Sequence, residues 1–227
     1  MSQQDRYEKS LNFFGAITRS LSHELNNVVA IINELNGLME DFLFAAEQGQ
    51  SLDPARIKNT VERIGNQVER GKAYIKQLNR FAHSVDNPRT RMDAGEILRL
   101  TTDICQRFAT LREVSLQCQL QDQGVQIEGS PFDLLQVIFR CIEIALGVSK
   151  PGASIMVGLE RVDDGISFTL TSQEVGDMNA ELSSQLSVAS HLVEKAGGRL
   201  QSVIETDKPM NLVVYLPSSL RPLSGED

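Results

Sequence analysis

Three side chains with complementary chemistry follow one another closely near the start of the chain. His23, Glu24 and Asn27 bring an imidazole, a carboxylate and a carboxamide within little more than one helical turn. An imidazole can attack an electrophile near neutral pH, a neighbouring carboxylate can hold or accept the proton of the other ring nitrogen, and an amide can orient water. The pattern therefore indicates phosphoryl transfer through His23.

These residues lie in a segment whose apolar residues recur every three or four positions. The repeat runs without proline from Asp5 to about Gln48, which predicts one long amphipathic helix. Its apolar stripe consists of Phe14, Ile17, Leu21, Leu25, Val28, Ile32, Leu35, Met39 and Phe42.

A second helix is expected after a short turn at 49–52. Asp53 is typical of an N-cap and Pro54 of a first helical residue. The helix is expected to run to about Ser84, with an apolar stripe of Ile57, Val61, Ile64, Val68, Ile75, Leu78 and Phe81. Two such helices cannot bury both stripes against each other alone, so a second copy of the chain is the natural partner. The expected object is a dimeric, antiparallel four-helix bundle.

The helical repeat also predicts which way His23 points. Two residues turn a helix by about 200°, so a seam through Leu21 and Leu25 leaves the imidazole facing solvent. Arg19, Asn27 and Ala30 lie on the same side. Arg19 can offset charge on a phosphorylated imidazole, and the small Ala30 leaves room for a docking partner.

The second half of the chain mixes helices and strands. Helices are expected at 94–110, 131–147 and 186–196, the last ending at Gly197-Gly198. Strands are expected at 114–120, 154–162, 166–171, 199–205 and 211–216, with a hairpin closed at Asp164-Gly165. The fold class is therefore α+β, a helical hairpin followed by an α/β sandwich of helices and antiparallel strands.

Composition narrows the possible roles. The formal net charge is −8, with the acidic excess in the second half, which argues against nucleic-acid binding. There is no apolar run long enough to cross a bilayer and no secretory signal pattern. Cys105, Cys118 and Cys141 have no metal-ligand spacing and are typical of core residues in a reduced protein. We expect a cytoplasmic protein, with no membrane partner.

The string Ser22-His23-Glu24-Leu25-Asn26-Asn27 resembles the H-box of bacterial sensor histidine kinases, in their dimerisation and histidine-phosphotransfer domain. The resemblance implies that His23 is the phosphoacceptor, that Glu24 assists it and that Asn27 positions water to dephosphorylate a partner. Arg19, Asn26 and Ala30 are assigned to partner docking. Val28 stands where the family often has proline, so the kink that proline causes is not expected.

The second half is similar in layout to that family's catalytic ATP-binding domain, but it departs at the nucleotide site. The helix at 131–147 should carry two asparagines, the second binding magnesium; Arg140 and Ile144 stand there instead. An isoleucine cannot ligate a hard cation that prefers oxygen. Glu143 keeps an acid nearby and Asp177 follows a glycine, but neither restores the set.

Two further segments of that nucleotide site differ from the family pattern. The segment 172–176 replaces an acid and glycines that hold adenine, and 183–186 replaces the glycine-rich lid. Without those glycines the backbone cannot approach phosphates closely. We therefore expect a degenerate domain at 91–219, between the phosphotransfer hairpin at 1–90 and a polar tail at 220–227, with no cofactor in this chain.

Several functions fit this pattern. The favoured hypothesis is a histidine phosphotransfer protein that relays a phosphoryl group between receiver-domain aspartates of response regulators through His23, the receiver supplying Mg²⁺. A response-regulator phosphatase dependent on Asn27 uses the same residues. A dimeric interaction module without chemistry and an active kinase with an unusual nucleotide mode are the remaining alternatives. Whether the chain is an enzyme is left open.

Overall fold

The computed structural model describes residues 3–120, 122, 124–176 and 181–223. It forms two compact units: one comprises Leu11–Ala82, and the other comprises the described residues from His83 onward together with those before Leu11. This division falls earlier than the boundary after residue 90 that the sequence suggests. Among the described residues, no helix combines the length and apolar character that a membrane span requires.

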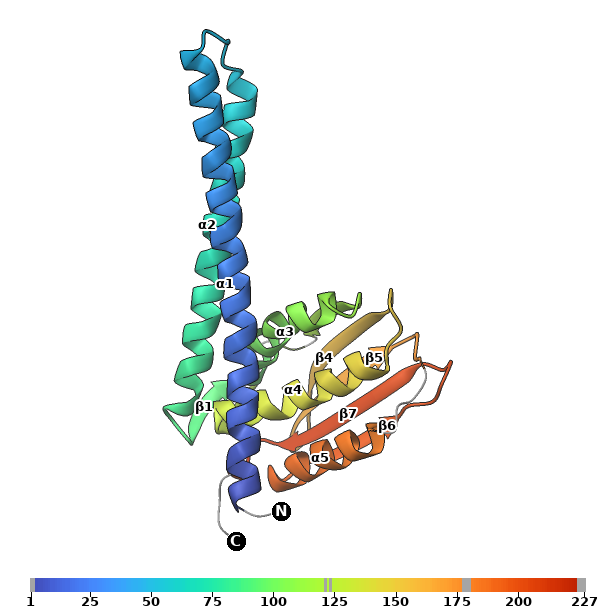
Figure 1. Cartoon of the computed structure of the whole chain (residues 1–227). Helices are drawn as coiled ribbons and strands as arrows, with labels where there is room; N and C mark the ends of the chain where they lie inside the picture. The colour runs from blue at the N-terminus through green and yellow to red at the C-terminus, as the bar shows by residue number, and fades with distance from the viewer. Residues whose placement is uncertain (1–2, 121, 123, 177–180, 224–227) are drawn as a thin grey trace. The chain divides into compact units, whose positions relative to one another are not determined.

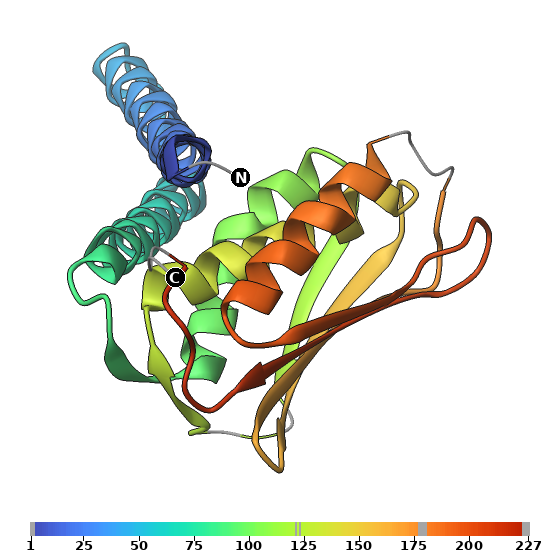
Figure 2. The same ribbon diagram turned by 90° about the horizontal axis from the view of Figure 1, so that it is seen from below.

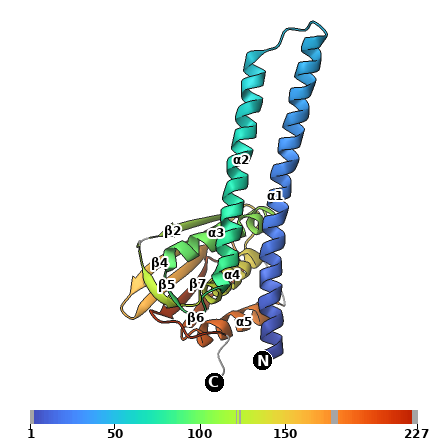
Figure 3. The same ribbon diagram turned by 90° about the vertical axis from the view of Figure 1, so that its left-hand side faces the viewer.

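The first unit is a helical hairpin. Helices α1 (Gln3–Glu47) and α2 (Pro54–Ala82) run side by side in opposite directions (Figures 1 and 3). Gly49 adopts a positive φ of 81° after α1, and Asp53 Oδ1 accepts a hydrogen bond from the backbone N–H of Ala55 at 2.9 Å. Both predicted helices, the turn and the Asp53 cap are therefore present.

Two close contacts set the register of the hairpin. A Cβ added to Gly71 would lie 3.3 Å from Cγ1 of Val28, so the two backbones approach closely there. At the other end, the ring of Phe81 stacks on Phe14, with centroids 5.0 Å apart, and meets Phe13 edge-on. The ring of Phe13 is fully buried, whereas the predicted Phe14 is only half-buried.

The hairpin leaves part of its apolar surface exposed. Val61, Val68 and Ile75 of α2 recur every seventh residue and expose 54 %, 40 % and 51 % of their surface. On α1, Val29, Leu43 and Phe44 are also exposed. The predicted stripe of α2 is therefore only partly covered within one chain.

The second unit begins with a 3-10 turn, His83–Val85, and two short strands that the sequence patterns do not predict. Strand β1 (Thr90–Asp93) pairs antiparallel with β3 (Gln126–Gly129). Four residues are too few to show an alternating pattern, so their pairing depends on contacts distant in the sequence.

The remaining elements build an α/β sandwich. Helices α3 (Ala94–Thr110), α4 (Pro131–Val148) and α5 (Leu182–Lys195) cover one face of a five-stranded sheet (Figure 2). The strands are β2 (Ser115–Leu120), β4 (Ser154–Val162), β5 (Gly165–Ser172), β6 (Arg199–Val203) and β7 (Met210–Pro217), in the order β2-β4-β5-β7-β6. The α+β fold class is confirmed, but β2 pairs parallel with β4, so the sheet is mixed rather than antiparallel throughout.

Local signals in the sequence explain where these helices begin and end. Asp93 accepts a hydrogen bond from the Gly95 N–H at 2.8 Å at the start of α3, and Ser130 accepts one from the Asp133 N–H at 3.1 Å at the start of α4. Gly197 adopts a positive φ of 89° after α5, as the glycine pair predicts.

The cysteines behave as core residues. Cys105 and Cys141 are buried and Cys118 is half-buried, all with free thiols. Burial raises the pKa of Cys141 to about 12, which keeps its thiol protonated and unreactive.

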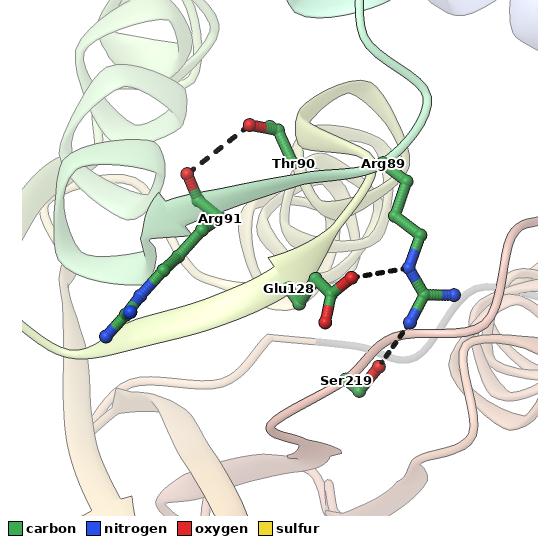
Figure 4. Close-up of polar contacts among 5 residues, drawn as sticks. All are labelled: Arg89, Thr90, Arg91, Glu128 and Ser219. Atoms are coloured by element: carbon green, nitrogen blue, oxygen red, sulfur yellow. Dashed lines mark hydrogen bonds and ion pairs between the residues drawn. The ribbon is translucent and has the colours of Figure 1, made fainter.

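The chain after β7 packs onto the sandwich. Leu220 and Leu223 are buried, and the Leu220 N–H donates to the carbonyl of Glu128 at 2.7 Å. Figure 4 shows Arg89 between β3 and this segment, with Nε 2.6 Å from Glu128 Oε1 and Nη2 3.0 Å from Ser219 Oγ. The Arg89 guanidinium lowers the pKa of Glu128. The packed structure therefore extends into the segment expected to be a tail.

Candidate functional site

His23 lies on the exposed face of α1. Leu21 and Val28 of the same helix are buried in the chain, while Arg19, Asn26, Asn27 and Ala30 are exposed together with the imidazole. The helical repeat thus presents the ring to solvent beside a guanidinium and two carboxamides. An imidazole in this position is accessible to a large partner, as in-line attack on a bound phosphoryl group requires.

Glu24 is held differently from its neighbour. Its side chain is half-buried, and its Oε2 accepts a hydrogen bond from the Tyr74 hydroxyl across the hairpin at 3.0 Å. Arg70 Nη2 lies 3.5 Å from the same tyrosine oxygen. Sequence analysis missed Tyr74. Counting residues outward from the turn at 49–52 brings Glu24 opposite a position about one helical turn beyond Tyr74, so the count locates the neighbourhood but not the partner.

The other two histidines have different surroundings. His83 is exposed, with Nδ1 2.7 Å from Asp86 Oδ2, and His191 is half-buried on α5. No group of three or more His, Cys, Asp or Glu side chains suited to a metal ion occurs among the residues that the structure describes.

The sandwich has a cavity of about 360 Å³ between α4 and α5. It is lined by Arg112, Arg140, Glu143, Ile144, Gly147, Glu181, Ser184, Gln185 and Val188. Inside it, Arg140 Nη1 donates to Glu143 Oε2 at 2.5 Å, and Arg140 Nε is buried without a hydrogen-bond partner in the described structure. The side chain of Ile144 is almost wholly buried.

No family model and no curated protein matches the sequence. Among solved structures, the catalytic domain of histidine kinase ThkA matches with a TM-score of 0.50 and 11 % identity, over 59 % of this chain and 99 % of that one. The α/β unit has the histidine kinase catalytic-domain fold.

Two further similar structures extend over more of the chain. Acinetobacter baumannii histidine kinase AdeS matches at 14 % identity and TM-score 0.48, over 86 % of this chain and 98 % of that one. A bacterial phosphotransferase matches at 15 % identity and TM-score 0.49, over 89 % and 95 %.

The histidine kinase fold implies Mg-ATP, so the cavity can be tested for its fit. Magnesium needs oxygen ligands, and Ile144 offers none where the family resemblance expects an asparagine. The ion pair of Arg140 with Glu143 occupies the same wall, and Ser184 and Gln185 stand where the family has glycines. These residues do not fit Mg-ATP bound in the family's manner. Asp177 lies outside the described residues.

Proposed function

We propose that this chain is a cytoplasmic histidine phosphotransfer protein of two-component or phosphorelay signalling, which passes a phosphoryl group between receiver-domain aspartates through His23 without using ATP. The observation that supports this most is a contrast within one chain: an exposed imidazole on a long hairpin accompanies a histidine kinase fold whose cavity lacks a magnesium ligand at Ile144.

The transfer needs no nucleotide. A lone pair of the neutral His23 imidazole attacks the phosphorus of a receiver's aspartyl phosphate, the N–P bond forms, and the P–O bond to the aspartate breaks. The aspartate carboxylate leaves with the electron pair. The other ring nitrogen still carries its proton, which passes to Glu24 or to solvent. The return step to a second receiver reverses these bond changes.

Charge on the hairpin suits such a partner. Arg63, Arg70, Lys72, Lys76 and Arg80 are exposed on α2, and Arg19 is exposed one turn before His23. A receiver presents an acidic pocket around its aspartate and brings its own Mg²⁺, so a basic helix favours encounter with it. Asn26 and Ala30 complete the docking surface that we propose.

The exposed apolar row Val61, Val68 and Ile75 suggests how the hairpin is completed. A seven-residue repeat on a helix is the pattern that packs against another helix. We assign this row to a second copy of the chain, which gives a homodimeric four-helix bundle with two His23 sites.

The test is transfer of labelled phosphoryl groups from a panel of ³²P-phosphorylated receiver domains to the full chain. We expect His23→Ala to abolish labelling, whereas His83→Ala, which removes another exposed imidazole, leaves it unchanged. Labelling that survives in His23→Ala would refute the relay.

The alternative phosphatase has one specific observation in its favour, the exposed carboxamide of Asn27 one turn after His23. Phosphate release that persists in His23→Ala and disappears in Asn27→Ala would establish it. Receiver binding unaffected by His23→Ala, without label or phosphate release, would instead indicate an interaction module. Calorimetric titration with Mg-ATP is expected to be flat; measurable heat of binding would favour the kinase.

A further inference from the structure

The segment after β7, residues 218–223, runs beside β3 and is called the strap below. The Glu128 N–H donates to the carbonyl of Ser218 at 2.7 Å, and the Leu220 N–H donates to the carbonyl of Glu128 at 2.7 Å. Ser219 and Glu128 therefore form a parallel bridge. Through this bridge the strap continues the hydrogen bonding of β3 by one short step.

Buried contacts hold the strap on the sandwich. The side chains of Leu220 and Leu223 are almost wholly buried, and the Leu223 N–H donates to Asp133 Oδ2 at 3.0 Å at the start of α4. A Cβ added to Gly129 would lie only 2.7 Å from Cβ of Leu220, so the missing side chain lets the strap approach β3 closely. Attachment by apolar burial and backbone hydrogen bonds is screened little by salt.

Arg89 connects the strap to the linker, which we define as residues 86–89, between the 3-10 turn and β1. All four linker residues are exposed. Figure 4 shows the Arg89 side chain reaching both sides of the bridge, with Nε 2.6 Å from Glu128 Oε1 and Nη2 3.0 Å from Ser219 Oγ. A single side chain of the linker thus binds both β3 and the strap.

The Arg89 contact is of a different kind from the contacts that hold the strap. The side chains of Arg89 and Glu128 are 55 % and 50 % exposed. An ion pair at such an exposed position contributes little to stability and is screened by salt. The Arg89 contact can therefore open while Leu220 and Leu223 stay buried.

We infer that the strap is part of a conformational device: through Arg89 it restrains the linker, and opening of this contact frees the linker while the strap stays on the sandwich. The linker belongs to the chain connection between α2 and β1. Its stiffness therefore limits how freely α2 can reorient against the sandwich. This inference does not depend on the proposed relay.

The experiment is ¹⁵N backbone relaxation on the full chain, which measures the order parameters of the linker amides. We expect about 0.85 in the parent chain and less than about 0.6 in Arg89→Ala. Arg91→Ala is the matched control, because Arg91 lies two residues further along and its side chain points away from Glu128 (Figure 4). It should leave the order parameters of the linker unchanged.

Salt provides a second measurement that needs no substitution. In about 1 M sodium chloride, where screening acts over only a few ångströms, the order parameters of the linker should fall as in Arg89→Ala. Those of the strap amides should keep their values.

A change in the strap itself should reach the linker. Leu220→Ala removes most of the side chain that packs on Gly129, and we expect it to lower the order parameters of both strap and linker. Leu170→Ala, which truncates another buried leucine, on β5, should leave the linker unchanged.

Three results would overturn the inference. The first is a linker that stays equally ordered in Arg89→Ala, and the second is an equal loss of order in Arg91→Ala. The third is a strap that loosens in salt together with the linker, because the contact would then not open independently. If circular dichroism shows that Leu220→Ala does not fold, the arginine variants and the salt series still decide.

Discussion

The hairpin and the sandwich differ in how completely they bury their large apolar side chains. In the sandwich, Phe168 and Leu170 of β5 are completely buried between the sheet and its helices. In the hairpin, Val61, Val68 and Ile75 expose between 40 % and 54 % of their surface in a regular row. The sandwich closes its own core, whereas two helices have too little surface to do so. This difference is what supports our proposal that a second copy of the chain completes the hairpin.

The same two regions also differ in where their polar groups lie. Near His23 the chemistry-bearing groups are exposed or shared across the hairpin, as Glu24 and Tyr74 are. In the sandwich cavity, Arg140 and Glu143 bind each other. The groups around His23 face solvent or the opposite helix, whereas the Arg140–Glu143 pair lies inside the cavity, with Arg140 Nε buried and without a hydrogen-bond partner in the described structure.

The largest loss of stability is expected from a substitution in the sandwich core. Phe168→Ala should destabilise the protein by about 3–5 kcal/mol, because it removes a fully buried ring and leaves a cavity. Val203→Ala, at an exposed position of β6, should change stability by less than about 0.5 kcal/mol. Urea unfolding of both variants measures the difference; equal losses would show that the core does not depend on β5.

Association of the hairpin is tested next. Val68→Glu places a charge in the middle of the exposed apolar row and should raise the dimer dissociation constant at least about 100-fold. Leu111→Glu, at an exposed apolar site after α3 that lies outside this row, should leave it unchanged. Analytical ultracentrifugation over a concentration series gives both values. A parent chain that is monomeric at all concentrations would remove the basis of the four-helix bundle.

The smallest change in stability is expected for substitutions at two glycines of α2, Gly65 and Gly71. Gly65 has open space around it, so Gly65→Ala should stabilise the chain by about 0.5–1 kcal/mol through the helix preference of alanine.

Gly71→Ala is the matched case with the opposite surroundings. Its Cβ would meet Val28 Cγ1 at 3.3 Å, and a valine in a helix has little rotamer freedom to move away. We expect the alanine gain to be cancelled or reversed. Thermal unfolding that shows the same gain for both variants would mean that the helices separate easily there.

Local patterns predicted the regular elements well. The apolar repeat located α1 and α2. Helix starts were marked by side chains that accept hydrogen bonds from free backbone N–H groups, those of Asp53, Asp93 and Ser130. The end of α5 was marked by Gly197, which adopts a positive φ. The periodicity also placed His23 on the exposed face, because a helix converts residue spacing directly into direction.

Strand pairings between segments far apart in the sequence could not be predicted from local patterns. The β1–β3 pair is four residues long, and the parallel pairing of β2 with β4 joins segments separated by α4. Neither follows from alternation within a strand, because pairing depends on which segments the packed helices bring together.

The sequence by itself thus determined the long hairpin, the α+β order of elements, the exposed histidine and an apolar side chain at Ile144, since each depends on residue type and local spacing. Only the tertiary structure decided that Glu24 is held by Tyr74 and that an apolar row of α2 stays uncovered. Both depend on the rotation and register of one helix against another, which packing at Gly71 and Phe81 sets and which no local pattern encodes.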